Sequence, residues 1–258
     1  MKALILAAGR GSRLNKYTFE LPKCMLNFKN KSLLERQLDR LKNIQVEKII
    51  VVTGYKSETI NFEGLTYYYN ENYATTNMLE SLMCAATEFN DDFLICYSDI
   101  IYSKKLLKTI SEANADFNVA VDSNWKEYWK IRYGTTNFDL ETLFVDSQNN
   151  IKEIGKSTSS SEGLNFRYIG MLKFSKKAMR KIVQLYDEKK KVNENWIQSG
   201  NCFKQGYFTD LLHELILFGE TIKAVPFNRG WLEFDTNEDY EIYSELVSKN
   251  VEWESDVL

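Results

Sequence analysis

Short apolar runs alternate with amphipathic segments through the first half of the chain. Apolar runs without polar alternation predict strands that are buried on both faces of a sheet. These runs cover residues 2–8, 48–53, 65–69 and 93–97. The leucine spacing between them predicts helices, one begun by Ser32 with Glu35 in its first turn and one begun at Thr76 or Asn77. Strands separated by helices need crossover connections, so we expect an α/β fold with a mostly parallel, twisted sheet flanked by helices.

The pattern of the second half is less regular. Two apolar runs on either side of Asn149-Asn150 predict a β-hairpin, and the serine-rich stretch 157–163 predicts a loop that could close over a substrate. The other expected elements are strands at 142–145, 151–154, 167–174 and 231–234, and helices at 176–186, 208–218 and from 237 onward. Because no linker or repeat separates the halves, we expect a single domain over 1–258 with two lobes, 1–122 and 123–258.

Composition narrows the class of protein. A chain of 258 residues with 44% hydrophobic residues can bury a core, and its net charge of -3 argues against a general nucleic-acid binder. No apolar run is long enough to cross a membrane. The four cysteines lie far apart and the chain has a single histidine, His213, which excludes a disulfide framework and an ordinary zinc cluster. His213 lies in an apolar helical run, where a structural role is expected. We expect a cytoplasmic protein with reduced cysteines. The sequence does not predict its oligomeric state, and a homodimer is one of the possibilities.

A loop with two glycines follows the first predicted strand. Gly9 and Gly11 let the backbone turn sharply and expose N–H groups to an anion, while Arg10 or Arg13 with Lys23 add positive charge. The loop lacks the Gly-Lys-Ser/Thr of a Walker motif and the third small residue of a dinucleotide fingerprint. We interpret it as a polyphosphate-binding loop; the alternative is an ordinary turn with surface charges.

Two aspartates follow apolar runs. Asp99 follows the run 93–97 after a single serine, Ser98, and in 231–235 the alternation puts Glu233 and Asp235 on one face. Parallel sheets bind ligands beyond the carboxyl ends of their strands, where the glycine loop and Asp99 both fall. Two such carboxylates could hold Mg²⁺ and leave positions for phosphate oxygens. The alternative is a helix N-cap, a serious one for Asp235 because Asp-Thr-Asn-Glu is typical of a helix start.

Several longer motifs extend this picture over nearly the whole chain. They are LILAAGRGSRL with LPK, NENYATTNMLESL, YSDI, WKEYWKIRY, DLETL, IKEIGKS, RYIGMLKFS, FTDLLHELI and WLEFDT. In these motifs the chain resembles the nucleotidyltransferases with a GT-A-like fold, and it is most similar to the cytidylyltransferases that act on phosphocholine and on phosphonates. The resemblance implies a Rossmann-like sheet with a nucleotide-binding lobe at 1–122, and a smaller acceptor lobe with the closing strand and helix at 123–258.

The resemblance also implies a role for individual residues. Those that would bind CTP, the co-substrate, are Leu6, Ala8, Gly9, Arg10, Gly11, Ser12, Asn77 and Ser81. Those that would act in catalysis are Arg13, Lys23, Asp99 and Asp235. Asp99 and Asp235 would hold Mg²⁺, with Glu233 as a further or water-mediated ligand.

Aromatic and charged residues of the second half are the candidates for binding the acceptor. Aromatic rings could cage a quaternary ammonium, basic residues could bind the acceptor phosphate, and acidic residues could recognise an ammonium. The candidates are Trp129, Arg132, Lys156, Tyr168, Asp210, Trp231 and Glu233. The alternatives are aromatic core packing, solvated charges and, for Asp210, a helix cap.

The resulting hypothesis is a cytidylyltransferase. It would transfer CMP from CTP to a small phospho- or phosphono-monoester, such as phosphocholine, aminoethylphosphonate or phosphoglutamine, and release pyrophosphate. The product would be a CDP-activated headgroup for a surface glycan, lipid or phosphonate pathway. An ionised acceptor needs no general base, so catalysis would come from alignment and charge neutralisation. The alternatives are a sugar-1-phosphate uridylyl- or thymidylyltransferase and a catalytically inactive nucleotide-binding regulator; in each case the partners are small molecules and not nucleic acids.

Overall fold

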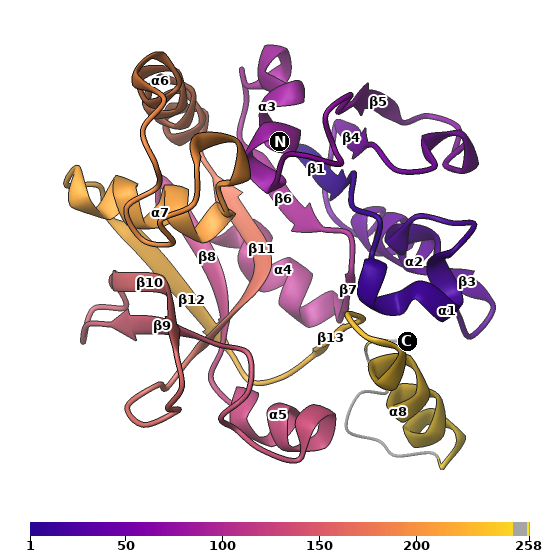
Figure 1. Cartoon of the computed structure of the whole chain (residues 1–258). Helices are drawn as coiled ribbons and strands as arrows, with labels where there is room; N and C mark the ends of the chain where they lie inside the picture. Colours follow the sequence, from indigo (N-terminus) through magenta and orange to yellow (C-terminus); the bar gives the residue numbers. More distant parts are fainter. Residues whose placement is uncertain (250–256, 258) are drawn as a thin grey trace.

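The centre of the molecule is a seven-stranded sheet (Figure 1). The structure, a computed structural model, describes residues 1–249 and 257. In spatial order the strands are β12 (Ile222–Phe227), β8 (Phe117–Asp122), β11 (Arg167–Phe174), β6 (Phe93–Tyr97), β1 (Lys2–Ala7), β4 (Lys48–Thr53) and β5 (Thr66–Tyr69). All neighbours are parallel except β11, which is antiparallel to both β6 and β8. The expected mostly parallel α/β sheet is therefore confirmed.

Three two-stranded ladders lie outside the central sheet. They pair β2 (Asn27–Phe28) with β3 (Lys31–Ser32), β7 (Ile100–Tyr102) with β13 (Trp231–Glu233), and β9 (Leu140–Val145) with β10 (Ile151–Thr158). The last of these is the predicted hairpin. The predicted loop 157–163 was placed too early, because Ser157 and Thr158 still pair with Glu141 and Leu140 in the ladder.

Helices cover the sheet and connect its strands. They are α1 (Asn15–Thr18), α2 (Leu33–Leu41), α3 (Met78–Cys84), α4 (Lys104–Glu112), α5 (Trp125–Tyr133), α6 (Lys176–Val192), α7 (Phe208–Leu217) and α8 (Asn237–Ser248). The start of α2 is as predicted: Glu35 N donates to Ser32 Oγ, and Ser32 N donates to the Glu35 carboxylate. Among residues 1–249 and 257, no helix combines the length and the apolar character that crossing a bilayer requires.

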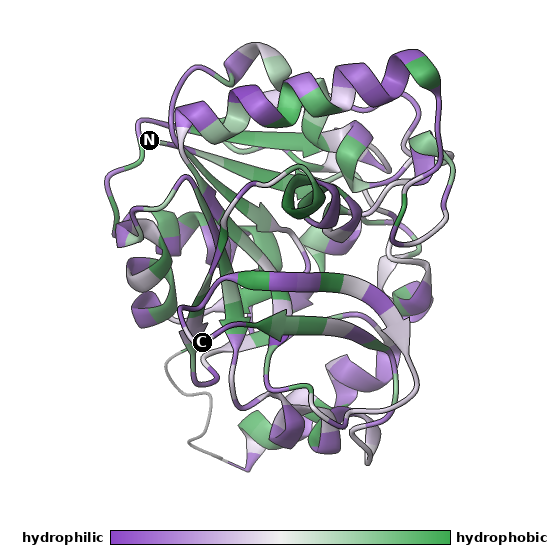
Figure 2. Ribbon diagram, turned by 90° about the vertical axis from the view of Figure 1, so that its left-hand side faces the viewer, coloured by the Kyte–Doolittle hydropathy of each residue, from purple (hydrophilic) through white to green (hydrophobic). Residues whose placement is uncertain are grey.

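The central strands are buried on both faces. Figure 2 shows that their residues are mostly hydrophobic. Along β1, Ala3 and Ile5 join a core with α2, α4, α5 and α8, while Leu4 and Leu6 join a second core with α3, α6 and α7. A fully buried leucine or isoleucine side chain contributes roughly 1.5–3 kcal/mol to folding. The sheet also takes strands from both sides of residue 122, so the division into a nucleotide lobe and an acceptor lobe stays a prediction about ligands.

Candidate active site

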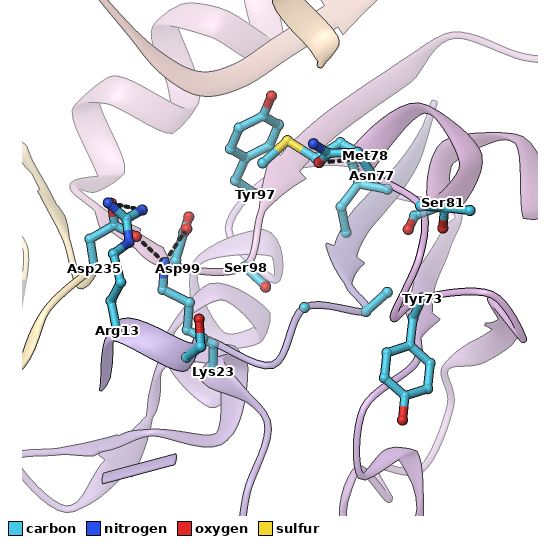
Figure 3. Close-up of a pocket in the computed structure, with 16 residues that line it drawn as sticks. Arg13, Lys23, Tyr73, Asn77, Met78, Ser81, Tyr97, Ser98, Asp99 and Asp235 are labelled. Carbon is cyan, nitrogen blue, oxygen red and sulfur yellow. Dashed lines mark hydrogen bonds and ion pairs between the residues drawn. The ribbon is translucent and has the colours of Figure 1, made fainter. Parts of the chain in front are cut away.

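A pocket of about 280 Å³ lies beyond the carboxyl ends of β1 and β6 (Figure 3). Its lining residues are Leu6, Ala8, Gly9, Gly11, Ser12, Arg13, Lys23, Tyr73, Thr76, Asn77, Met78, Ser81, Tyr97, Ser98, Asp99 and Asp235. Sheets of this kind bind their ligands at this edge. The pocket brings together every residue predicted for nucleotide binding or catalysis except Arg10. The exposed Arg10 guanidinium lies over the Tyr55 ring, 5.3 Å from its centroid, and its role in nucleotide binding stays a prediction.

The glycine loop is folded tightly against Lys23. Gly11 has a φ of +70°, and a Cβ at this position would lie 2.9 Å from the Cβ of Lys23. The turn is closed by Leu14 N, which donates to Gly11 O at 2.9 Å. Both the positive φ and the close approach require glycine. The loop and the lysine therefore form one packed unit.

The β7–β13 ladder brings Asp99 and Asp235 together. Asp99 directly precedes β7, Asp235 is the second residue after β13, and the two strands are antiparallel. Phe234 N also donates to Asp99 O at 2.9 Å. The Gln37 side-chain amide donates to the carbonyls on either side of the Asp99 turn, Tyr97 O at 2.8 Å and Ile100 O at 2.6 Å. Two carboxylates that are far apart in the sequence thus share one site.

The structure decides between the two interpretations of the segment around Asp235. The N-cap of α8 is Thr236, whose Oγ1 accepts a hydrogen bond from Asp239 N at 3.2 Å. The Asp239 carboxylate in turn accepts from Thr236 N and Asp235 N, each at 2.9 Å. The predicted helix start is confirmed, but its capping groups belong to Thr236 and Asp239. The Asp235 carboxylate lines the pocket instead.

Lys23 lies between the two carboxylates (Figure 3). Its Nζ is 2.6 Å from Asp99 Oδ2 and 2.5 Å from Asp235 Oδ1, and Arg13 Nη2 is 2.7 Å from Asp235 Oδ2. Burial alone would lower the pKa of Lys23, but the charges of Asp99 and Asp235 outweigh it and raise that pKa. Burial alone would raise the pKa of Asp235, but Lys23 and then Arg13 hold it below its ordinary value. At neutral pH the lysine is protonated and Asp235 is ionised.

The donor set fits a divalent cation. Asp99 Oδ1 is buried and has no hydrogen-bond partner among the described residues. Asp99 and Asp235 already turn oxygens toward a common cation, the Lys23 ammonium. Mg²⁺ takes one or two protein carboxylates and fills its remaining positions with phosphate oxygens and water. These two residues would therefore suit a magnesium ion that arrives with a nucleotide.

The other end of the pocket is built around the start of α3. Asn70 Nδ2 donates to Thr76 Oγ1 at 3.1 Å and to Ser81 Oγ at 3.0 Å, which fixes both hydroxyl groups. The Asn77 side chain caps the helix by accepting from Met78 N at 2.8 Å. Polar groups held in this way suit the nucleoside end of a nucleotide.

Five residues of the pocket were not predicted. They are Tyr73, Thr76, Met78, Tyr97 and Ser98. Thr76, Met78 and Ser98 each adjoin a predicted residue, and Tyr97 lies two residues from Asp99, so nearness to the motifs was an available signal. Tyr73 gave no such signal. It packs closely against Gly54, since a Cβ added to this glycine would lie 2.6 Å from the Cβ of Tyr73.

Two aromatic candidates for the acceptor site belong to the core. Trp129 and Trp231 are almost fully buried. Their indole N–H groups donate to protein acceptors, Trp129 to Phe138 O and Trp231 to Asp122 Oδ2, each at 2.8 Å. The structure therefore corrects the expectation that these rings cage a cation, since neither presents a free face to a ligand.

Two charged candidates are also structural. The Arg132 side chain is 0% exposed and donates to both carboxylate oxygens of Asp239 at 2.8 Å, and it pairs with Glu233 as well. Asp210 caps α7 by accepting from Tyr207 N at 2.8 Å, and from Ser199 N and Oγ at 2.9 Å. Both expectations are corrected, because each side chain already has its partners inside the protein.

The remaining acceptor candidates are reachable by a ligand to different degrees. Lys156 is exposed on β10. Tyr168 is half-buried, and its hydroxyl makes no hydrogen bond with any described residue. The Glu233 side chain is 24% exposed beside Arg132. Burial raises the pKa of Glu233 to about 7 against the attraction of Arg132. Their roles stay predictions.

Fold and pocket together define a class of protein. Nucleotidyltransferases combine a Rossmann-like sheet with a glycine loop, a lysine and paired carboxylates at its carboxyl edge, and the chain falls in that class. Residues 3–198 match the MobA-like NTP transferase domain, and the chain belongs to this family. It is 30% identical to the CTP:phosphoglutamine cytidylyltransferase of Campylobacter jejuni over 95% of this chain and 100% of that protein.

Two further relatives come from Streptococcus pneumoniae. A choline-phosphate cytidylyltransferase is 29% identical over 57% of this chain and 65% of that protein. A solved structure of a CTP:phosphocholine cytidylyltransferase superposes with a TM-score of 0.75 at 21% identity, over 95% of this chain and 98% of the other. The latter likeness extends the predicted GT-A-like fold to nearly the whole molecule.

Proposed function

We propose that the chain is a cytidylyltransferase that transfers CMP from CTP to a small phospho- or phosphono-monoester and releases pyrophosphate. The observation that carries this proposal is the Lys23 ammonium between Asp99 and Asp235, beside a glycine loop at the edge of the sheet. The choice of CTP is supported by the relative from Campylobacter jejuni, which is named for CTP and matches along nearly the whole chain.

In the proposed reaction an ionised oxygen of the acceptor attacks the α-phosphorus of CTP. A new phosphorus–oxygen bond forms, the bond from this phosphorus to the bridging oxygen breaks, and its electron pair leaves with pyrophosphate. A phosphate or phosphonate oxygen is already ionised at neutral pH, so no residue has to remove a proton. This accounts for a pocket that contains no histidine among its lining residues.

The glycine loop and the predicted polar residues of the pocket then have roles in binding or charge neutralisation. N–H groups of the glycine loop would bind the triphosphate. Lys23 and Arg13 would neutralise charge on the reacting phosphates, where fixed cations are most effective. Asn77 and Ser81 would position the nucleoside. Mg²⁺ held by Asp99 and Asp235 would neutralise phosphate charge and align the reacting groups when bound.

Pyrophosphate release tests this proposal. The wild-type protein is incubated with Mg²⁺ and CTP and one acceptor at a time: phosphocholine, aminoethylphosphonate, phosphoglutamine or glucose 1-phosphate, with UTP as the control nucleotide. We expect release with CTP and a small acceptor, together with the corresponding CDP product. Release with UTP and glucose 1-phosphate alone would move the chain to the sugar nucleotide enzymes. Tight CTP binding without release would make it a nucleotide-binding regulator.

A further inference from the structure

A small cavity outside the nucleotide pocket is lined by charges of both signs. Its volume is about 20 Å³, and its walls are Glu141, Thr142 and Leu143 of β9 with Arg167 and Tyr168 of β11. A cavity of this size admits one water-sized polar group, which is the size of an ammonium group or of one carboxylate oxygen. The lining thus offers an acid, a base and a hydroxyl to one polar group of a ligand, and the rest of a larger ligand would lie outside the cavity.

The polar groups around this cavity are incompletely satisfied. Arg167 Nη1 and Tyr168 Oη are buried and have no hydrogen-bond partner among the residues that the structure describes. Burial raises the pKa of Glu141 above its ordinary value, although the charge of Arg167 acts against the shift. Buried polar groups without partners destabilise a protein and are rare in native structures. Their concentration at one cavity is what a ligand subsite requires.

The Arg167 guanidinium has a fixed position. It lies over the Trp129 ring at 4.5 Å from the centroid. Trp129 itself is held in the core by its indole hydrogen bond to Phe138 O. A stacked guanidinium keeps its N–H edge available for a planar anion such as a carboxylate.

Tyr97 connects this cavity to the nucleotide pocket. It lines that pocket, and its ring extends away from Ser98 and Asp99 (Figure 3). The ring meets that of Tyr168 edge to face, with 5.8 Å between centroids. Burial raises the pKa of Tyr97, the neighbouring Tyr168 hydroxyl adds to the shift, and the charges of Glu141 and Asp99 add less, so both carboxylates are within electrostatic reach of one ring.

Gly170 makes this connection possible. It has a φ of +76°, and a Cβ there would lie 2.5 Å from the Tyr97 ring. The β11–β8 register is irregular between Tyr168 and Leu172, around this glycine. The ring of Tyr97 therefore packs directly on the β11 backbone, next to the strand end that carries Arg167 and Tyr168.

We propose that Glu141, Arg167 and Tyr168 bind the end of the acceptor that is remote from its phosphate, and that this end is zwitterionic, with an ammonium and a carboxylate group as in an amino acid. One carboxylate oxygen would enter the cavity and accept hydrogen bonds from Arg167 and Tyr168, and the ammonium would lie at the edge of the cavity and donate to Glu141. A quaternary ammonium alone would leave the guanidinium without a partner. This inference rests on the proposed function, because it names the substrate class of the same site.

Three phospho-monoesters separate the charges of such a ligand. O-phosphoserine carries an ammonium and a carboxylate, phosphoethanolamine the ammonium alone and phosphoglycolate the carboxylate alone. Their binding is measured by calorimetry with Mg²⁺ and a non-hydrolysable CTP analogue. We expect O-phosphoserine to bind at least about 10-fold more tightly than either of the others, because a site built for a polar group discriminates strongly against its absence. Glu141→Gln and Arg167→Gln should each abolish this preference, and Glu153→Gln on the same hairpin should keep it.

The outcomes distinguish this subsite from the proposed function. Equal binding of the three compounds to the wild type, or a preference that survives both substitutions, overturns the subsite. Turnover with CTP but without a preference for the zwitterion leaves the proposed function in place and removes the subsite. A preference for the zwitterion that depends on Glu141 and Arg167, without turnover of any acceptor, supports the subsite and contradicts the proposed function. Unchanged affinity for the CTP analogue shows that a variant is folded; where a variant fails this check, the wild-type comparison of the three compounds decides.

Discussion

Lys23 holds together two carboxylates that would otherwise repel each other. Its ammonium contacts Asp99 and Asp235, and the glycine loop packs on its aliphatic stem at Gly11. A buried cation in this position stabilises the empty site, and in the proposed reaction it also neutralises the phosphates. The same side chain therefore serves the fold and the chemistry, so its substitution should affect both.

Lys23→Met is expected to lower the turnover number at least about 100-fold, because a fixed charge at the reacting phosphates is removed. It should also lower the melting temperature, since two carboxylates lose their shared partner. Pyrophosphate release and thermal unfolding measure the two effects. Lys16→Met is the matched control, because that lysine is 60% exposed beside Glu241 and should change neither quantity. Full turnover in Lys23→Met would contradict the proposed site.

Asp235→Asn and Thr236→Ala separate the site from the helix cap. Thr236→Ala removes the N-cap of α8 and should cost about 1 kcal/mol of stability with turnover retained. Asp235→Asn should reduce turnover at least about 100-fold, because the pocket loses a charged group that faces the reacting phosphates. Urea unfolding and pyrophosphate release are measured on both variants. Loss of stability with full activity in Asp235→Asn would mean that this residue is structural after all.

At the scale of elements, α5 and α8 hold the turn that carries Asp235. Arg132 of α5 binds both oxygens of Asp239 in α8, and Asp239 accepts a hydrogen bond from the Asp235 backbone N–H. Tyr128 and Tyr243 also face each other between these helices, with their hydroxyls 2.5 Å apart. The carboxylate in the pocket therefore depends on residues that do not line the pocket themselves.

Arg132→Met should lower the free energy of unfolding by about 3–5 kcal/mol, since it leaves the buried Asp239 carboxylate without its cation. Arg180→Met on the exposed side of α6 is the control and should stay within about 0.5 kcal/mol of the wild type. Urea titration at pH 7 gives both values. A small effect in Arg132→Met would show that the arginine is not buried against Asp239 and would restore it as an acceptor ligand.

The elements differ in how well the sequence predicts them. Continuous apolar runs predicted β1, β4 and β6 almost to their ends. The strands β8 and β12 were missed because β8 contains the buried polar residues Asn118 and Asp122, and because Pro226 interrupts the apolar pattern of β12, a proline that an edge strand tolerates. Helix α5 was missed since its aromatic residues follow no amphipathic period.

The residues of the candidate site also differ in how well the sequence predicts them. Topology alone predicted the position of Asp99, because this residue lies just beyond the end of a strand. The roles of Lys23 and Asp235 came from the resemblance of their motifs, and the helix-cap alternative for Asp235 was decided only by the structure. The burial of Arg132 was not predictable, because its partner Asp239 lies far along the chain and on another helix. Charge alone does not distinguish a ligand residue from one half of a buried ion pair.

At the scale of the whole molecule, one acidic residue joins strands at the end of the sheet opposite the pocket. Glu88 pairs with Lys2 of β1 at 2.8 Å and also with Lys48 of β4. Hydrogen bonds from these lysines lower the pKa of Glu88 to about 2. The folded-state pKa is depressed, so the contribution to stability is present above the ordinary pKa of 4.5 and is lost as the pH falls toward 2.

Glu88→Gln should therefore lower the melting temperature at pH 7, and the difference from the wild type should shrink between pH 4.5 and pH 2. Thermal unfolding at pH 7, 4 and 3 measures it. Glu112→Gln on the exposed end of α4 supplies a charge-matched control that should show no such convergence. A difference that stays constant with pH would mean that the lysines do not pair with the ionised carboxylate.

The β7–β13 ladder also has a consequence for synthesis on the ribosome. Every strand of the central sheet, together with Lys23 and Asp99, is translated before β13. A growing chain can thus assemble its sheet while Lys23 has only one of its two carboxylates. The second arrives when β13 has left the exit tunnel and paired with β7. If Asp235 acts as proposed, a chain whose last ladder is still open would turn over less nucleotide than the folded protein.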